Sequence, residues 1–457
     1  MNVKKEGGRT MMQGAGACHD KDRAMIERYN EVIGECGHLT YFPLVVEKYE
    51  GAVITDIDGN EYIDFLSSAS SMNLGGSHPA IMKAVREQLE KVSQYATAYT
   101  FNAPMVEYAE RITSVYPGGV RAKVAYGHSG SDSNDGAVKI VRAYTGRDKI
   151  ITFSNAYHGS TYGASSMTTV TSRMRSGVGP MLPGIYAFPF FDSSMEDDHV
   201  EENCTAQIEK AFEMYMPADE VAAMIIEPIQ GDGGMLPAHP VFMNKLYDIC
   251  RRHGILFITE EVQQAMGRTG KWFSVEHYGI VPDGMILGKS FGAGFPLGAF
   301  IGRAEIVDSL KAPAHGFTFA GNHVSCCAGA AAFDVMSEPG FFEEVTAKGE
   351  YIMESLRQLR EKHGIIGDIR GIGMSIGAEI ITGDGSPDAN GTNLICRRSF
   401  DKGLVMISIG GNVLRVQPPL VITYEEIDAG LDIIDEVISE YLAGAIPEEI
   451  LADCNSW

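Results

Sequence analysis

Residues 256–290 read LFITEEVQQAMGRTGKWFSVEHYGIVPDGMILGKS, and the two ends of this segment are alike. Each end is a short apolar run, Leu256–Thr259 or Gly284–Leu287, that is followed within two residues by a charged side chain. Runs of this length are typical of buried strands. Polar side chains that follow buried parallel strands lie at the edge where open α/β sheets bind ligands. The segment therefore predicts two strands that end at a binding site.

The same pattern continues on both sides of this segment. From about residue 120 to residue 310, short apolar runs alternate with helical segments, and helices dominate from about 315 to 360. The alternation indicates a largely parallel sheet covered by helices. The other candidate strands are Lys123–Tyr126, Lys149–Phe153, Ala222–Ile226 and Leu297–Ile301.

The two ends of the chain differ from this central part. Near the N-terminus, the runs Val53–Ile57 and Glu61–Phe65 flank an Asp-Gly-Asn turn and predict a hairpin. Helices are predicted before and after it, at Asp22–Cys36 and Pro79–Val92. The C-terminal part predicts three strands and then a helix, at Met374–Ile380, Val405–Ile407, Leu414–Val416 and Tyr424–Leu442.

These elements predict an α/β fold with two lobes, since 457 residues are too many for one ordinary core. We expect residues 76–340 to form a large domain, with a mainly parallel sheet between helices. We expect residues 1–75 and 341–457 to form a small α+β domain together.

The composition excludes several kinds of partner. Sixty acidic residues against 37 basic ones give a formal charge of −23, which repels nucleic acid and anionic lipid. No apolar stretch approaches the ~18 residues of a membrane span, and no signal peptide is evident. The eight cysteines include no C-x-x-C pair, so we expect reduced thiols in a cytoplasmic protein and no metal site.

Lys289 and Glu260 are the first candidates for chemistry. A lysine that directly follows an apolar strand is partly desolvated, which lowers its pKa and frees the amine for Schiff-base formation. Glu260 follows the other strand, where a carboxylate can meet a protonated ring nitrogen, and Gln263 can donate to a phenolate oxygen. The alternatives are a lysine that reaches out to solvent and an ordinary acidic loop.

Three further motifs follow predicted strands. Small residues in Ser129–Asp135 precede a helix and favour a phosphate there, although a simple helix cap is the alternative. Tyr157 stands beside a Gly-rich turn and can stack on a flat ring, or it is a core tyrosine. The carboxylates of Glu227–Gly234 follow an apolar strand, at the position of a ligand site or of a solvated loop.

In their order and setting, these motifs resemble the class III aminotransferases of PLP fold type I. The resemblance runs from about Tyr41 to Tyr441. Its most specific part is Glu260–Gln263 followed by Gly267–Lys271, Asp283 and Lys289. The resemblance implies pyridoxal 5'-phosphate as the cofactor, held as a Schiff base on Lys289.

The resemblance also assigns the other cofactor contacts. It implies that Gly130 and Ser131 bind the phosphate, that Tyr157 and Val262 pack against the two faces of the ring, and that Gln263 approaches the ring hydroxyl. Thr318 resembles the threonine that reaches the phosphate of the neighbouring subunit. That implies a homodimer, or a dimer of dimers, with shared active sites.

Glu260 departs from the family pattern, which usually has aspartate there. The pyridinium partner keeps its charge but gains one methylene, a displacement of about 1.5 Å. We still expect a carboxylate–pyridinium pair at this position.

Within the family, the chain most resembles the isoleucine 2-epimerase group of amino-acid racemases. In that reading Arg415 binds the substrate carboxylate through two parallel bonds. Asp232 either returns a proton to Cα on the face away from Lys289 or only orients Arg415. The stretches that carry the resemblance are Ser68–Ser70, Tyr157–Gly163, Gly179–Pro183, Gly231–Gly234 and Ala312–His315.

The activity expected from this resemblance is inversion at Cα of an aliphatic amino acid. The alternative is an ω- or 4-aminobutyrate-type aminotransferase, which passes the amino group to a keto acid. A third interpretation is a PLP-fold binding module without catalysis, but the intact Lys289, Gln263 and phosphate turn argue against it.

Overall fold

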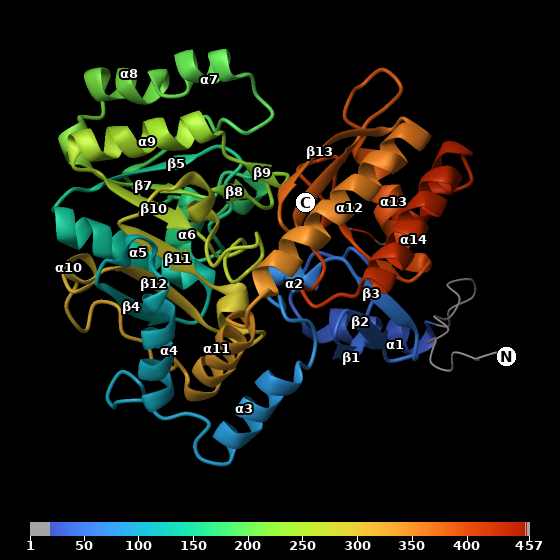
Figure 1. Cartoon of the computed structure of the whole chain (residues 1–457), viewed down its shortest axis with the longest axis horizontal. Coiled ribbons are helices and arrows are strands. Elements are labelled where there is room, and N and C mark those ends of the chain that lie inside the picture. The colour runs from blue at the N-terminus through green and yellow to red at the C-terminus, as the bar shows by residue number, and fades with distance from the viewer. Residues whose placement is uncertain (1–18, 453, 455–457) are drawn as a thin grey trace.

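The larger lobe is built on a seven-stranded sheet of order β4-β12-β11-β10-β7-β5-β6 (Figure 1). The computed structural model describes residues 19–452 and residue 454. Only β12 runs against its neighbours, so the mainly parallel α/β sheet predicted from the sequence is confirmed. The strands are β4 Ala122–Gly127, β5 Lys149–Phe153, β6 Ile185–Phe188, β7 Val221–Ile226, β10 Leu256–Glu260, β11 Gly284–Leu287 and β12 Gly298–Arg303.

This sheet differs from the sequence prediction in the exact bounds of several strands and in one additional strand. The strand expected at Leu297–Ile301 begins one residue later, at Gly298, and continues to Arg303. The edge strand β6 was not predicted, although Ile185–Phe188 is a short apolar run; in the structure it is only partly buried.

The two faces of the sheet are buried against different helices. Along β7, Ile225 packs in one apolar cluster with α5 (Gly130–Thr145), whereas Met224 packs in another with α9 (Pro240–His253). Because successive side chains of a strand point to opposite faces, a sheet covered on both sides has continuous apolar strands. This is why the central strands read as unbroken apolar runs.

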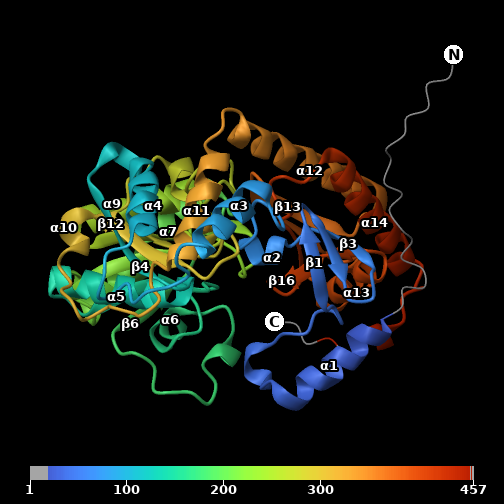
Figure 2. The same ribbon diagram turned by 90° about the horizontal axis from the view of Figure 1, so that it is seen from below.

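The smaller lobe combines both ends of the chain (Figure 2). Strand β15 (Leu404–Val405) pairs in parallel with β3 and so joins the C-terminal segment to the N-terminal hairpin. The predicted strand Val405–Ile407 is therefore wrong in one respect: the chain breaks at Met406, and β16 belongs to a second sheet. The remaining strands are β1 Val46–Glu50, β2 Val53–Asp56, β3 Glu61–Asp64, β13 Ile366–Ile372, β14 Ser375–Ile380, β16 Ile407–Ile409 and β17 Val413–Val416, with β8 Ile229–Gln230 and β9 Leu236–Pro237 as a separate ribbon.

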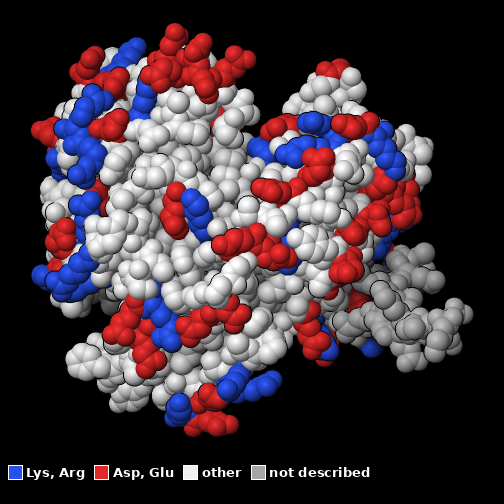
Figure 3. Space-filling view, viewed as in Figure 1, with Lys and Arg blue, Asp and Glu red and all other residues white. Residues whose placement is uncertain are grey.

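Helices cover the rest of both lobes, and no helix of residues 19–452 is both long and apolar enough to cross a membrane. Acidic side chains gather over α7 and α8 at the top of the larger lobe (Figure 3). The other helices are α1 Asp20–Val32, α2 Ser67–Ser70, α3 Pro79–Leu89, α4 Ala103–Ser114, α6 Tyr162–Met167, α7 Asp197–Asn203, α8 Ala206–Met214, α10 Ala304–Val307, α11 His323–Met336, α12 Phe341–His363, α13 Ala389–Asp401 and α14 Tyr424–Leu442.

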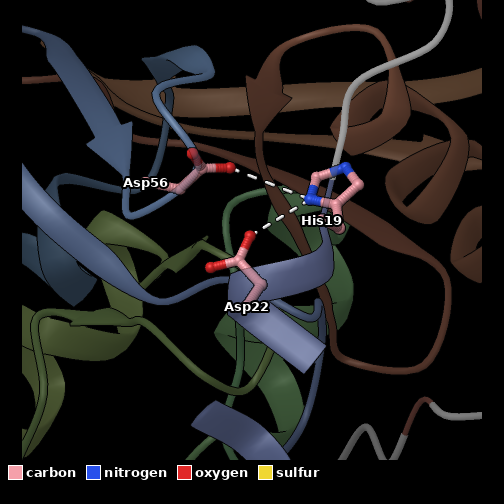
Figure 4. A group of neighbouring side chains, drawn as sticks. All are labelled: His19, Asp22 and Asp56. Atoms are coloured by element: carbon pink, nitrogen blue, oxygen red, sulfur yellow. Dashed lines mark hydrogen bonds and ion pairs between the residues drawn. The ribbon is translucent and has the colours of Figure 1, made fainter. Parts of the chain in front are cut away.

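Helix α1 is fixed to the β2–β3 hairpin by a charged cluster (Figure 4). The Nδ1 atom of His19 lies 3.1 Å from Asp22 and 3.8 Å from Asp56, and both carboxylates are buried. Asp22 also accepts the Val45 backbone N–H at 3.0 Å, and Asp56 accepts that of Asn60 at 2.8 Å. Protein donors therefore satisfy these carboxylates, and the cluster serves to hold the N-terminal helix.

Arg268 joins the two lobes and is fully buried. Its guanidinium donates to the Ser67 hydroxyl and the Asn73 side chain at 2.9 and 2.7 Å. It also donates to the carbonyls of Met374 and Pro418 at 3.1 and 2.6 Å. One side chain of the larger lobe thus holds both terminal segments of the smaller lobe.

Candidate active site

One cavity of about 390 Å³ lies where five parallel strands of the large sheet end. The polar residues that follow β4, β5, β7, β10 and β11 all reach it, as the sequence predicts for the carboxyl edge of such a sheet. The cavity brings together most of the predicted site residues, namely Gly130, Ser131, Tyr157, Asp232, Glu260, Val262, Gln263 and Lys289.

Lys289 stands two residues after β11 in a left-handed backbone conformation, with φ of 49°. Gly288 precedes it because a Cβ there would lie 2.8 Å from the backbone nitrogen of Gly130. Burial lowers the pKa of the Lys289 amine, although the nearby Asp232 carboxylate opposes that effect. A desolvated amine just beyond the carboxyl end of a strand is suited to nucleophilic attack on an aldehyde.

The turn before α5 forms a place for an anion. Ser129 caps the helix, since its hydroxyl accepts the Asp132 N–H at 3.3 Å while Asp132 accepts the Ser129 N–H at 2.8 Å. Gly130 lets this turn pack closely against Val262, because a Cβ would lie 2.7 Å from the Val262 side chain. The backbone N–H groups and the dipole of a 16-residue helix favour a phosphate here.

Tyr157 is held in place through its backbone. Its N–H donates to Glu227 at 2.9 Å, and its hydroxyl lies 3.2 Å from that of Ser160. Ser160 in turn donates its N–H to the Ser131 hydroxyl at 3.1 Å. The aromatic residue and the phosphate turn are therefore parts of one hydrogen-bonded unit.

Arg415 lies behind the cavity and contacts two residues that line it. It is 1% exposed, and its Nη1 donates to Asp232 at 3.1 Å. Its Nε donates to Gln417 at 2.6 Å. The Gln263 amide, with its oxygen turned toward the two cations, accepts from Arg415 Nη2 at 3.1 Å and from Lys289 Nζ at 3.0 Å. Burial lowers the pKa of Arg415, and its pairing with Asp232 opposes that effect.

Sequence reasoning assigned no role to His158 and quoted Glu227 only as part of a loop. Both line the cavity together with Glu260, and all three are at least 95% buried, with exposures of 2%, 5% and 4%. Burial raises the pKa of Glu227 and of Glu260. The carboxylates of Glu260 and Asp232 raise the pKa of Glu227 further. The signal that could have pointed to them is the repeated placement of an acidic or imidazole side chain after predicted apolar strands.

Thr318 does not join the other predicted residues. It is exposed, lies outside the lining of this cavity, and its carbonyl accepts from the Gln94 side chain at 2.7 Å. Within one chain, therefore, it is not a cofactor contact.

The residues present fit pyridoxal phosphate. The helix N-terminus suits the phosphate, glycines leave room where the turn meets Val262, Tyr157 offers an aromatic face, and the Lys289 amine is free for an aldehyde. Fold and site together define a PLP-dependent enzyme of fold type I.

Comparison with known proteins leads to the same class. The model of the aminotransferase class-III family matches residues 37–438. An isoleucine 2-epimerase from Lentilactobacillus buchneri is 38% identical over 93% of this chain and 97% of its own. A leucine/methionine racemase from Thermococcus litoralis is 37% identical over 95% and 99%. An acetylornithine aminotransferase from Caldanaerobacter subterraneus subsp. tengcongensis is 38% identical over 87% and 95%.

A solved structure agrees with these relatives. The PMP-bound form of an aminotransferase from Vibrio fluvialis matches with a TM-score of 0.81 at 28% identity, over 88% of this chain and 93% of that one. The chain belongs to the class III aminotransferase family, and its cofactor is pyridoxal phosphate.

Proposed function

We propose that this protein is an amino-acid racemase or epimerase that inverts Cα of aliphatic amino acids. One observation carries the proposal: Asp232 lines the same cavity as Lys289, so a carboxylate and an amine border one binding space. Two such groups suit inversion, since one can take the proton from one face of Cα while the other returns a proton to the opposite face. The epimerase and racemase relatives, which align over nearly the whole chain, support it.

In this proposal the residues that line or contact the cavity have separate roles. When bound, the cofactor supplies an electron sink for the carbon that loses its proton. Lys289 takes the proton from Cα on one face, and Asp232 returns one on the other. Arg415 holds the substrate carboxylate, and Gln263, whose amide oxygen accepts from both Arg415 and Lys289, fixes the positions of these two side chains.

A second candidate is an aminotransferase, which a specific contact favours. Arg415 is already paired with Asp232, so Asp232 has a role as an orienting partner even without proton transfer. The acetylornithine aminotransferase relative is as identical to this chain as the epimerase, though over a shorter part of it. The two candidates differ in where the proton returns: to Cα or to the cofactor.

The experiment that separates them uses the PLP-loaded enzyme and L-isoleucine in deuterium oxide, with no keto acid present. We expect deuterium to enter Cα and D-allo-isoleucine to appear, as followed by NMR. Absence of inversion, together with loss of the amino group once 2-oxoglutarate is added, would make the enzyme an aminotransferase.

We also propose that two chains share their sites through Thr318. Its exposure outside its own cavity supports this, as do the exposed aromatic side chains of Tyr99, Phe101 and Phe319. Phe319 directly follows Thr318, and the other two follow Gln94 and Thr97, whose side chains bond the Thr318 carbonyl. Sedimentation should give at least twice the 49.5 kDa of one chain. Thr318→Ala should weaken PLP retention about tenfold, since one charge-assisted bond is worth ~1.5 kcal/mol. A monomer that retains PLP normally would refute the assignment.

A further inference from the structure

The turn that carries Asp232 is the tip of a ribbon that reaches from the larger lobe to the smaller one. Strands β8 and β9 pair in antiparallel orientation, and residues 231–235 join them. The ribbon lies beside β13, at the boundary between the two lobes (Figure 1). Three of the four residues in Gly231–Gly234 are glycine, so the turn has few side chains of its own to hold it. Contacts with the surrounding residues therefore fix the position of Asp232.

Two arginines of the smaller lobe hold this turn at two points. The Nη1 atom of Arg415 donates to Asp232 at 3.1 Å. The Nε atom of Arg370 donates to the Gly234 carbonyl at 2.9 Å. Both arginines belong to one sheet, in which Gly377 of β14 lies opposite Arg370 on one side and opposite Arg415 on the other. Directly opposed residues of antiparallel strands point to the same face, so the two side chains leave one face of the sheet on either side of Gly377.

Gly377 leaves room for the turn between the two arginines. A Cβ at this position would lie 2.9 Å from the Cβ of Met235 and 3.2 Å from the Gly234 carbonyl oxygen. Within the turn, the N–H groups of Gly234 and Met235 both donate to the Gly231 carbonyl at 3.1 Å. The turn is therefore one compact unit that packs on the sheet, and a shift of the Gly234 carbonyl shifts Asp232 with it.

The smaller lobe also holds Arg370 itself in place. The side chain is 9% exposed, and its Nη1 atom pairs with Asp368 at 2.9 Å and with Glu379 at 2.6 Å. Arg370 is not among the residues that line the cavity. It therefore has no direct contact with a molecule bound there, and its contact nearest to the candidate acid is the bond to Gly234.

We propose that Arg370 is a positioning residue, which clamps the turn together with Arg415 and so sets where the Asp232 carboxylate meets Cα. This inference rests on the proposed function, in which Asp232 returns the proton on the face away from Lys289. A general acid has to lie within hydrogen-bond reach of the atom that it protonates, and a displacement of about 1 Å can cost roughly 10²-fold in rate. The smaller lobe thereby positions the acid for inversion as well as the arginine for the substrate carboxylate.

The first test compares inversion with Cα hydrogen exchange in deuterium oxide, using the PLP-loaded enzyme and L-isoleucine. Arg370→Met keeps an unbranched side chain but removes the N–H that bonds Gly234. We expect inversion to fall about 10- to 100-fold relative to exchange, because proton removal by Lys289 on the other face does not depend on the turn. A ratio equal to that of the wild type, or a loss confined to KM, would overturn the proposal.

Glu379→Gln is the matched control. It removes a charge that pairs with Arg370, but it keeps an oxygen for Nη1 and leaves the bond from Nε to Gly234 in place. The ratio of inversion to exchange should stay within about twofold of the wild type, since a partly exposed ion pair contributes little. An equal fall in Glu379→Gln would make the ion pair, and not the bond to the turn, responsible, and the proposal would be wrong.

Gly377→Ala disturbs the turn from below and leaves Arg370 unchanged. The added methyl group would meet Met235 and the Gly234 carbonyl, so the turn has to move away from the sheet. Inversion should again fall relative to exchange. If Arg370→Met does not fold, this variant decides the matter, and an unchanged ratio in it refutes the clamp.

Amide hydrogen exchange of the holoenzyme separates a failure of the clamp from a failure of the proposed function, because it needs no substrate. Mass spectrometry of a peptide that spans residues 229–237 should show the N–H groups of Gly234 and Met235 exchanging about tenfold faster in Arg370→Met than in the wild type. Unchanged exchange rates would exclude the clamp whichever reaction the enzyme catalyses. If exchange is faster but Asp232→Asn inverts isoleucine at the full rate, the clamp is present, and the positioning proposal fails together with the assignment of Asp232.

Discussion

Replacing Lys289 by alanine is expected to abolish covalent attachment of the cofactor and to lower the rate of Cα proton exchange by about 10⁴-fold. The loss is large because one amine does two things. It is the only lysine that lines the cavity within the described part of the chain, and in the proposed mechanism it also removes the proton from Cα. No neighbouring side chain there offers a second amine.

Borohydride reduction followed by mass spectrometry measures the attachment directly. The wild type should gain one reduced cofactor on the peptide that contains Lys289, and the variant should gain none. Lys245→Ala is a suitable control, because Lys245 pairs with Glu201 on the surface of the larger lobe, at 2.7 Å, far in the fold from the strand ends. An adduct that persists in Lys289→Ala would place the cofactor on another lysine.

The residues next to strand ends were predictable from the sequence. Lys289, Glu260 and Gln263 follow apolar runs directly, and the carboxyl ends of parallel strands share one edge, so their convergence needs no knowledge of strand order. The phosphate turn was predictable for a similar reason, since a capped helix directly follows β4.

Contacts that depend on the order of strands were not predictable. The sequence does not say that β5, β7 and β10 are neighbours, and only that order brings His158, Glu227 and Glu260 together. The Asp232–Arg415 pair joins residues 183 positions apart in different lobes, and it was suggested by the family resemblance rather than by local pattern. The break at Met406 within the predicted strand Val405–Ile407 was not predictable either. It arises because Val405 joins the sheet of the N-terminal hairpin and Ile407 joins a second sheet.

Replacing Asp232 by asparagine is expected to separate inversion from exchange. If Asp232 returns the proton on the face away from Lys289, inversion should fall about 10²- to 10³-fold, since a positioned general acid contributes in that range. Exchange of Cα hydrogen from the Lys289 face should continue, with retention of configuration. Asparagine keeps an oxygen for the Nη1 atom of Arg415, which now donates to Asp232 at 3.1 Å, so the arginine should remain in place.

A purely orienting role gives a different result. Inversion and exchange would then fall together, chiefly through a higher KM, because the substrate carboxylate would meet a displaced guanidinium. Gln417→Ala is the control for a purely orienting role. It removes the partner of Arg415 Nε, 2.6 Å away, without altering the lining of the cavity. It should raise KM and leave the ratio of inversion to exchange unchanged. Asp232→Asn should change that ratio, and if it inverts isoleucine at the full rate, the second acid must be sought elsewhere in the cavity.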